Sequence, residues 1–352
     1  MRILVTGGCG FIGATVCRRL IAGGAVVLNL DIQTYAASPA SLGEAAASDR
    51  YTHRAVDITD ASAVKAAFAG FEPQAVLHLA AETHVDRSIV GPDAFVHTNV
   101  VGTLTLLEAA RVFRDSLAVD EAVAFRFVHV STDEVYGSLG PDGLFNEDSA
   151  YDPRSPYSAS KAGSDHLARA WFHTYGLPVI VTNCSNNYGP RQFPEKLIPL
   201  MILNGLQGRD LPVYGDGGQV RDWLHVEDHA MALERVLGAG RPGQTYVVGG
   251  RSERTNLQVV EAVCAALDHY APAARPHAEQ IRFVEDRPGH DRRYAIDPTR
   301  IETELGWRAE HDFDSGLDQT VRWYLDNRDW WERLRARYDA QRLGLPDRAV
   351  TG

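Results

Sequence analysis

Apolar and polar positions along the chain follow two alternating periods. Short apolar runs rich in β-branched residues, typical of buried strands, are each followed by a segment whose apolar positions have helical spacing. The strands predicted in this way are Arg2–Thr6, Ala25–Asp31, Thr52–Val56, Ala75–Ala80, Phe125–Ser131, Pro178–Asn183 and Gln244–Val248. The helices predicted between them are Ala14–Ala22, Ala61–Ala69, Asn99–Ala110, Ser158–Tyr175 and Ala230–Leu237. Repeated strand–helix units without a tandem repeat predict an α/β fold with a doubly wound parallel sheet.

The turn between the first predicted strand and helix is rich in glycine. Gly7, Gly10 and Gly13 flank Phe11 and Ile12 in a G-x-x-G-x-x-G pattern, which differs from the commoner G-x-G-x-x-G fingerprint. Glycines let the backbone turn tightly and let a pyrophosphate approach the N–H groups at a helix N-terminus. The sequence therefore predicts a Rossmann sheet that binds a dinucleotide, with an ordinary strand–helix–strand unit as the alternative.

An acidic residue, Asp31, ends the second predicted strand. A carboxylate there accepts hydrogen bonds from ribose hydroxyls and repels a 2′-phosphate, which favours NAD over NADP. Four further positions are assigned to the cofactor. Asp57 and Ile58 either face the adenine ring or belong to a structural loop, Ala80 ends a predicted strand, and Asn99 pins neighbouring loops through its side chain.

A hydroxyl and two adjacent carboxylates, Thr132, Asp133 and Glu134, follow the predicted strand Phe125–Ser131. Ligands of open α/β sheets bind outside the carboxyl ends of the strands, so these groups are catalytic candidates. Tyr157 and Lys161 share one face of the next helix, where the lysine is expected to lower the phenol pKa, ordinarily about 10. Repulsion between the carboxylates is expected to raise one pKa, leaving one acid and one base. The alternatives are a solvated loop and a chance Tyr-x-x-x-Lys spacing.

Other polar positions point to a substrate. Thr83 and His84 follow the predicted strand Ala75–Ala80, although a hydrogen-bonded loop histidine is an equal alternative. Residues 287–294 form the densest basic cluster, whose arginines suit a bidentate grip on a diphosphate. The alternative for any one of these arginines is a solvated surface charge.

The composition shifts after Asn183 toward Gly, Pro, Arg and loops, with a strand predicted from Pro212 and an amphipathic segment at Leu257–Leu267. We predict an NAD-binding Rossmann domain over 1–183 plus about 221–249. A smaller mixed α/β C-terminal domain over 184–220 and 250–331 is predicted to bind substrate. Beyond Trp323 a partly exposed helix and then a disordered end are expected, with 332–352 as a C-terminal tail.

Composition restricts the partners. The chain of 352 residues has a net charge of -11, which argues against nucleic acid as the main partner. It enters a strand at once without a signal peptide and has no apolar run long enough to span a membrane, so a cytoplasmic protein is expected. Its 4 cysteines have neither metal-ligand nor disulfide spacing; we expect reduced packing residues and no metal.

The glycine pattern together with Tyr157-x-x-x-Lys161 resembles the extended short-chain dehydrogenase/reductase superfamily. Within it, the motifs resemble the dTDP-glucose 4,6-dehydratase family from Met1 to about Trp331. The motifs that carry this resemblance are Thr132–Glu134, Ala81–Ser88, Lys196–Pro199, Arg221–Asp228 and Arg287–Tyr294. The segment after Asp31 departs from the family pattern at Ile32, Gln33 and the Ala-rich stretch Ala36–Ser48.

The resemblance implies a lyase of deoxysugar biosynthesis. Tyr157 would remove the proton of the glucose 4-hydroxyl, with Thr132 bonded to the same oxygen. Glu134 would take the C5 proton and Asp133 would protonate the departing 6-hydroxyl, while NAD is reduced and regenerated. A nucleotide-sugar substrate, favoured as dTDP-glucose, and a homodimer formed through helices flanking the sheet are also implied. Further substrate residues implied by the resemblance are Asn187, Lys196, Leu197, Pro212, Tyr214, Arg221, Asn256, Arg287, His290 and Tyr294.

Three alternatives remain at this point. Another nucleotide-sugar 4,6-dehydratase would differ in the base it recognises. A 4-epimerase or decarboxylase of the same fold needs the Tyr–Lys pair but no acid–base pair for eliminating water. A regulatory or scaffold protein with a dead site belongs to a different class, and the intact Tyr157, Lys161 and Glu134 argue against it.

Overall fold

The computed structural model describes residues 1–335 and 337. Its main feature is a seven-stranded sheet in the order β10-β6-β5-β4-β1-β2-β3, in which every pair of neighbours is parallel. The strands are β1 (Arg2–Thr6), β2 (Val26–Leu30), β3 (Tyr51–Arg54), β4 (Ala75–His78), β5 (Arg126–Thr132), β6 (Val179–Cys184) and β10 (Thr245–Val248). The doubly wound parallel sheet predicted from the sequence is confirmed.

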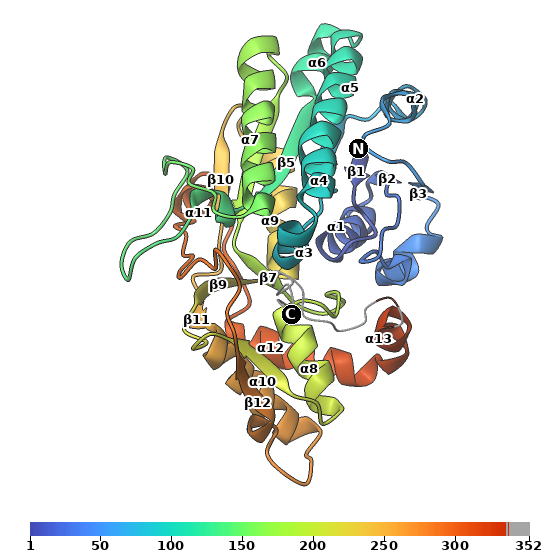
Figure 1. The fold of residues 1–352 in the computed structure, drawn as a ribbon. Coiled ribbons are helices and arrows are strands. Elements are labelled where there is room, and N and C mark those ends of the chain that lie inside the picture. Colours follow the sequence, from blue (N-terminus) through green and yellow to red (C-terminus); the bar gives the residue numbers. More distant parts are fainter. Residues whose placement is uncertain (336, 338–352) are drawn as a thin grey trace, which may run out of the picture.

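Helices cover both faces of this sheet, because its strands are apolar on both sides. In β1, Ile3 and Val5 pack into one core with helices α1 (Phe11–Ala22) and α9 (Val226–Ala239). Leu4 points to the other core, formed with α2 (Ala61–Phe71), α5 (Thr103–Asp115) and α7 (Pro156–Tyr175). Figure 1 shows α5 and α7 running side by side along the sheet.

Short helical segments connect these elements. They are η1 (Pro39–Ala47), α3 (Val85–Val90), α4 (Pro92–Phe95), η2 (Val96–Gly102, a π-helix), α6 (Val119–Ala124), η3 (Asp133–Tyr136) and α11 (Thr299–Leu305).

A smaller lobe lies below the large sheet in Figure 1. It contains a three-stranded sheet, β11-β9-β7, and a parallel pair, β12-β8. Its own core includes Ile202, Val260 and Val321. Its elements are β7 (Asn186–Tyr188), α8 (Leu197–Leu206), β8 (Leu211–Tyr214), β9 (Val220–His225), β11 (Glu253–Thr255), α10 (Asn256–Tyr270), η4 (His277–Gln280), β12 (Ile281–Val284), α12 (Phe313–Asp326) and α13 (Arg328–Arg335).

Two local details differ from the sequence reading. Helix α9 begins at Val226 rather than Ala230, so Asp228 lies inside its first turn. Strand β9 pairs with β7 and β11 outside the large sheet, although it falls within the segment 221–249 predicted for the Rossmann domain. Most of the expected tail, 338–352, lies outside the described residues.

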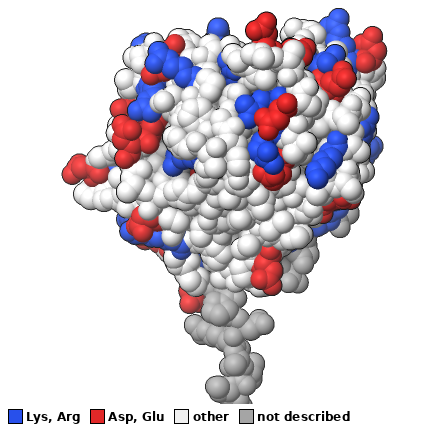
Figure 2. All heavy atoms as spheres, turned by 90° about the horizontal axis from the view of Figure 1, so that it is seen from above, with Lys and Arg blue, Asp and Glu red and all other residues white. Residues whose placement is uncertain are grey.

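The surface has no single charge character on the face seen from above. Acidic and basic side chains alternate there around a broad uncharged area (Figure 2). No helix in the described part of the chain combines the length and apolar composition needed to cross a bilayer. The described cysteines are all free and buried, as expected from their spacing.

Candidate functional site

The glycine turn between β1 and α1 closes one end of a cavity of about 330 Å³. Gly7 has a φ of +73°, and a Cβ atom there would lie 2.8 Å from the Ala80 backbone. A Cβ at Gly13 would lie 2.1 Å from the carbonyl oxygen of Gly7. The N-cap of α1 is Gly10, with no capping hydrogen bond from a described side chain, so the first N–H groups of the helix remain available for an anion.

Asp31 lies immediately after β2 and lines the same cavity. Its Oδ2 accepts a 2.8 Å hydrogen bond from the Cys9 N–H, and its Oδ1 accepts one of 2.7 Å from the Gln33 N–H. These bonds fix the carboxylate at the mouth of the glycine turn. Further predicted cofactor residues that line the cavity are Phe11, Ile12, Asp57, Ile58 and Ala80.

Asn99 acts from behind the cavity. It is buried in the π-helix η2, where its Oδ1 accepts from the Glu82 N–H at 2.9 Å. Its Nδ2 donates to the Glu82 carbonyl oxygen at 3.0 Å and to Ser160 Oγ at 2.9 Å. The predicted pinning of loops by this side chain therefore agrees with the hydrogen bonds in the structure.

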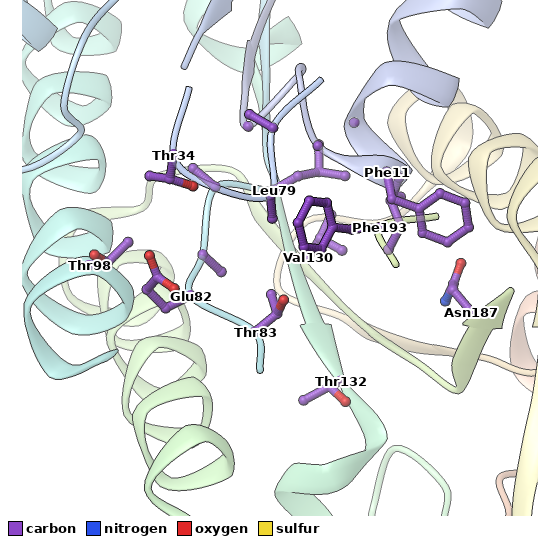
Figure 3. A pocket seen from close by; sticks show the side chains of 18 of the residues that line it. Phe11, Thr34, Leu79, Glu82, Thr83, Thr98, Val130, Thr132, Asn187 and Phe193 are labelled. Atoms are coloured by element: carbon purple, nitrogen blue, oxygen red, sulfur yellow. The ribbon is translucent and has the colours of Figure 1, made fainter. Parts of the chain in front are cut away.

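The five catalytic candidates meet at the carboxyl end of β5 and all line the cavity. Thr132 ends the strand, and Asp133 and Glu134 form the 3-10 turn that follows. Tyr157 and Lys161 lie in the first turns of α7, which a Ser155–Ser158 capping box and Pro156 begin. In Figure 3, Thr132 lies at the end of β5, with Thr83 and Glu82 on one side and Asn187 on the other.

The two carboxyl groups have different surroundings. Burial, followed by the Glu134 charge, raises the pKa of Asp133 well above its ordinary value. Burial also raises the pKa of Glu134, while the positive charges of Arg287, Arg221 and Lys196 oppose that rise. Burial thus favours the protonated form of Asp133, whereas the nearby positive charges favour the ionised form of Glu134.

The prediction that Lys161 lowers the pKa of the Tyr157 phenol below its ordinary value is wrong for this structure. Burial raises the pKa of Tyr157 well above 10, followed by the Glu134 charge, and the neighbouring Thr132 hydroxyl only partly opposes this. The Lys161 Nζ instead donates to the carbonyl oxygen of Val130 at 2.8 Å. Four-residue spacing puts both side chains on one helix face, but burial raises the pKa of the phenol by more than the lysine charge can lower it.

The predicted substrate residues fall into three sets. Thr83, Asn187 and Lys196 line the cavity, and Lys196 Nζ donates to the Thr83 carbonyl oxygen at 3.1 Å. A second set lies beyond Glu134 and consists of Tyr214, Arg221, Arg287, His290 and Tyr294. The remaining positions, His84, Leu197, Pro212 and Asn256, lie outside the described lining of the cavity.

The second set is held by internal contacts. The Arg221 guanidinium lies over the Tyr294 ring, 4.1 Å from its centroid, and is buried. Asp86 accepts from Arg287 at 2.7 Å and from the Tyr214 hydroxyl at 3.0 Å. The charges of both arginines act on Glu134, which places them at the same end of the site.

The basic cluster 287–294 is not one anion site. Arg292 pairs with Asp216 at 3.1 Å and Arg293 with Glu253 at 2.8 Å, both on the partly exposed surface. Of these three arginines, Arg287 has its charge close enough to act on Glu134, so anion binding stays a prediction for Arg287.

Several residues that line the cavity were not predicted from the sequence. Glu195 has a side chain only 1% exposed, and it accepts hydrogen bonds from Tyr35 at 2.9 Å and Arg87 at 3.2 Å. Phe193 and Gln192 line the cavity from the same loop. No spacing in the sequence connects this loop with Tyr35, which lies 160 positions earlier.

Comparison with known proteins finds relatives over nearly the whole chain. A family model described as GDP-mannose 4,6 dehydratase matches residues 4–320. A probable dTDP-glucose 4,6-dehydratase of Sinorhizobium fredii is 56% identical over 350 residues, covering 99% of this chain and 100% of the relative.

Two solved structures of different activity are similar to this chain. DesIV, a dTDP-glucose 4,6-dehydratase from Streptomyces venezuelae crystallised with NAD, is 47% identical with a TM-score of 0.87, covering 95% of this chain and 100% of that one. A UDP-glucose 4-epimerase from Thermus thermophilus in complex with NAD is 30% identical with a TM-score of 0.82, covering 93% and 100%. The fold alone therefore does not separate the two activities, whereas sequence identity does.

Proposed function

The chain belongs to the GDP-mannose 4,6 dehydratase family, within the extended short-chain dehydrogenase/reductase superfamily, and from this premise we propose the following activity. It is an NAD-dependent hydro-lyase that converts dTDP-glucose to dTDP-4-keto-6-deoxyglucose and water. The observation that carries the proposal is the joint position of the Tyr157–Lys161 pair and the Asp133–Glu134 pair on one cavity. The first pair suits oxidation of a hydroxyl, and the second suits elimination of water.

The residues around the glycine turn fit NAD. Side chains at Gly7 or Gly13 would clash with the Ala80 and Gly7 backbones, so glycine is required for the tight turn whose N–H groups would face the pyrophosphate. The Asp31 carboxylate would accept hydrogen bonds from the hydroxyls of the adenosine ribose. When bound, NAD supplies a hydride acceptor for C4 of the sugar and later a hydride donor for C6. Gly10, Phe11, Ile12, Asp57, Ile58, Ala80 and Asn99 complete the proposed cofactor site.

Tyr157 is the proposed base for the sugar 4-hydroxyl. Its high pKa in the protein alone means that the phenol needs nearby positive charge to release its proton. Lys161 supplies an ammonium on the same helix face, and the cationic nicotinamide ring of the cofactor adds to it. Thr132, which lines the cavity together with Tyr157, would hold the same substrate oxygen.

The adjacent carboxyl groups complete the reaction. Oxidation at C4 acidifies the C5 proton, which Glu134 accepts. Asp133, kept protonated by burial, donates its proton to the departing 6-hydroxyl, so that the C6–O bond breaks and water leaves. Return of the hydride to C6 and of a proton from Glu134 to C5 gives the 4-keto-6-deoxy product.

The nucleotide diphosphate of the substrate would contact the second set of predicted substrate residues, which includes Arg221 and Arg287. Arg221 and Arg287 are the proposed diphosphate ligands, since a planar guanidinium can donate two parallel hydrogen bonds to two oxygens of a phosphate. Asn187 and Lys196 approach from the cavity side. The remaining proposed substrate residues are Thr83, His84, Leu197, Pro212, Tyr214, Asn256, His290 and Tyr294.

The chain is also proposed to form a homodimer through the helices that flank the sheet. Along the outer face of α5 and the turn before it, Val101, Leu104 and Val112 are 38%, 37% and 50% exposed. They recur with helical spacing and form an apolar stripe that a second copy would cover. Molecular mass in solution tests this proposal. The division into two domains and the cytoplasmic location stay predictions.

A panel of nucleotide sugars tests the proposed activity. The purified protein is incubated separately with dTDP-, UDP-, CDP- and GDP-glucose, and a 4-keto product is measured by its ultraviolet absorbance in alkali and by mass. We expect a 4-keto sugar, lighter than the substrate by one water, to form from dTDP-glucose at the highest rate. Isomerisation to a galactose nucleotide without loss of water would identify an epimerase, and an unchanged sugar in every case would indicate a scaffold.

A further inference from the structure

A buried carboxylate on the catalytic helix takes no part in the steps above. Asp165 is on α7, one turn beyond Lys161, and is fully buried. Its Oδ1 accepts from His129 Nε2 at 3.0 Å, and its Oδ2 accepts from the Tyr151 hydroxyl at 2.8 Å and Asn183 Nδ2 at 3.1 Å. A buried carboxylate is retained only where donors and an opposite charge replace its lost hydration.

Besides the hydrogen-bonded His129, the Lys161 ammonium one turn earlier on α7 acts on Asp165 as a positive charge. Burial lowers the pKa of Lys161, and the Asp165 carboxylate raises it. His78 on β4, His129 on β5, Cys184 on β6 and Tyr157 are the other titratable groups around it.

These other groups carry no compensating charge near neutral pH. Burial lowers the pKa of both His78 and His129 and raises that of Cys184 to about 12. Burial likewise keeps Tyr157 protonated in the protein alone. Among the described side chains around Lys161, the negative charge is therefore that of Asp165.

Asp165 also reaches the catalytic strand end. Asn183 Nδ2, which donates to Asp165, donates as well to the Thr132 carbonyl oxygen at 3.1 Å. The Tyr136 hydroxyl donates to Asn183 Oδ1 at 3.3 Å, so the amide orientation is fixed from both sides. The chain Asp165–Asn183–Thr132 thus connects α7 with the end of β5.

We propose that Asp165 is a positioning residue for the oxidation step, which balances the Lys161 ammonium and ties the catalytic helix to the strand end that carries Thr132. This inference rests on the proposed function, because that function assigns Lys161 to the oxidation of a sugar hydroxyl. Without the carboxylate, Lys161 loses its proton at a lower pH, and the cation that favours the Tyr157 phenolate is lost with it.

The pH dependence of turnover in the holoenzyme tests the charge. Asp165→Asn keeps the shape and removes the charge, so the alkaline limb of kcat should move down by about one pH unit. Tyr151→Phe is the matched control, because it removes one hydrogen bond to Asp165 and leaves the charge. The alkaline limb of the kcat profile of Tyr151→Phe should stay at the wild-type pH. A wild-type profile in Asp165→Asn, or an equal shift in both variants, overturns the proposal.

A double-mutant cycle tests the pairing without any activity. Thermal unfolding is measured for wild type, Asp165→Asn, Lys161→Met and the double variant. Because each single change leaves one buried charge unbalanced, the double variant should be more stable than the sum of the single losses predicts. If Asp165→Asn does not fold, recovery of a folded double variant supports the pairing, and failure of both overturns it, as additive losses do. A wild type that makes no 4-keto sugar would refute the proposed function and leave this cycle valid.

Discussion

Lys161 Nζ donates a 2.8 Å hydrogen bond to the carbonyl oxygen of Val130. The bond joins α7 to β5 two residues before Thr132, and Lys161 is only 5% exposed. The ammonium is therefore held at a fixed place on the helix face it shares with Tyr157. A cation held in this way lowers the pKa of the Tyr157 phenol most when the substrate and cofactor exclude water from the cavity.

Replacing this lysine by an uncharged residue should abolish most of the activity. Lys161→Met removes the cation and the bond to Val130, and we expect 4-keto product formation to fall about 10²–10⁴-fold. Lys65→Met, on the exposed side of α2, is the control and should behave as wild type. A Lys161→Met enzyme with the wild-type rate would exclude Lys161 from the chemistry.

Glu134→Gln should separate oxidation from elimination. The amide keeps the size of the side chain and cannot accept the C5 proton, so dehydration should fall about 10²–10⁴-fold. Exchange of the C5 proton with heavy water, followed by NMR, should fall with it, while substrate binding persists. Glu121→Gln on α6 removes an exposed carboxylate and serves as the control. Wild-type dehydration in Glu134→Gln would show that another group is the base.

Asp133→Asn should raise stability at neutral pH while lowering turnover. Burial raises the folded-state pKa of Asp133 above its ordinary value of 3.8, so the folded state binds this proton more tightly than the unfolded state. Stability from this group is thus fully present below pH 3.8 and is lost as pH rises toward the folded-state pKa. Melting temperatures of both proteins between pH 4 and 9 should diverge with rising pH. A constant difference across that range would contradict the raised pKa.

The segment around Asp31 should set cofactor choice. Asp31→Ala removes the proposed ribose acceptor and the bonds to the Cys9 and Gln33 N–H groups. NAD should bind more weakly, and its advantage over NADP should narrow. Calorimetric titration of both cofactors measures this, with the exposed Asp49→Ala as control. An unchanged ratio of the two affinities would mean that Asp31 does not face the ribose.

The large sheet was predictable because its signal is local. Each strand is a short apolar run, and turn chemistry such as the glycines at 7, 10 and 13 marks where the chain folds back. The positions of Thr132, Asp133 and Glu134 followed from the rule that ligands bind at strand carboxyl ends. The spacing of Tyr157 and Lys161 likewise placed both on one helix face.

Non-local contacts were beyond the sequence reading. Asp86 meets Arg287 across 201 positions, and Glu195 meets Tyr35 across 160. Helix α8 was missed because Lys196–Pro199 reads as a loop motif, although apolar residues after it recur in a helical pattern. Asp165 carried a usable signal, since it continues the four-residue spacing of Tyr157 and Lys161. Only burial shows that its charge matters, and burial depends on the packed fold.

The fate of the C4 hydrogen tests the central claim most directly. Substrate labelled with deuterium at C4 is converted by the holoenzyme, and the product is examined by NMR and mass spectrometry. If oxidation, elimination and reduction occur within one site, the label should appear on the C6 methyl group of the 4-keto product, without accumulation of free NADH. Recovery of the label in free NADH would identify a net dehydrogenase, and its return to C4 an epimerase; either result would contradict the proposed dehydratase.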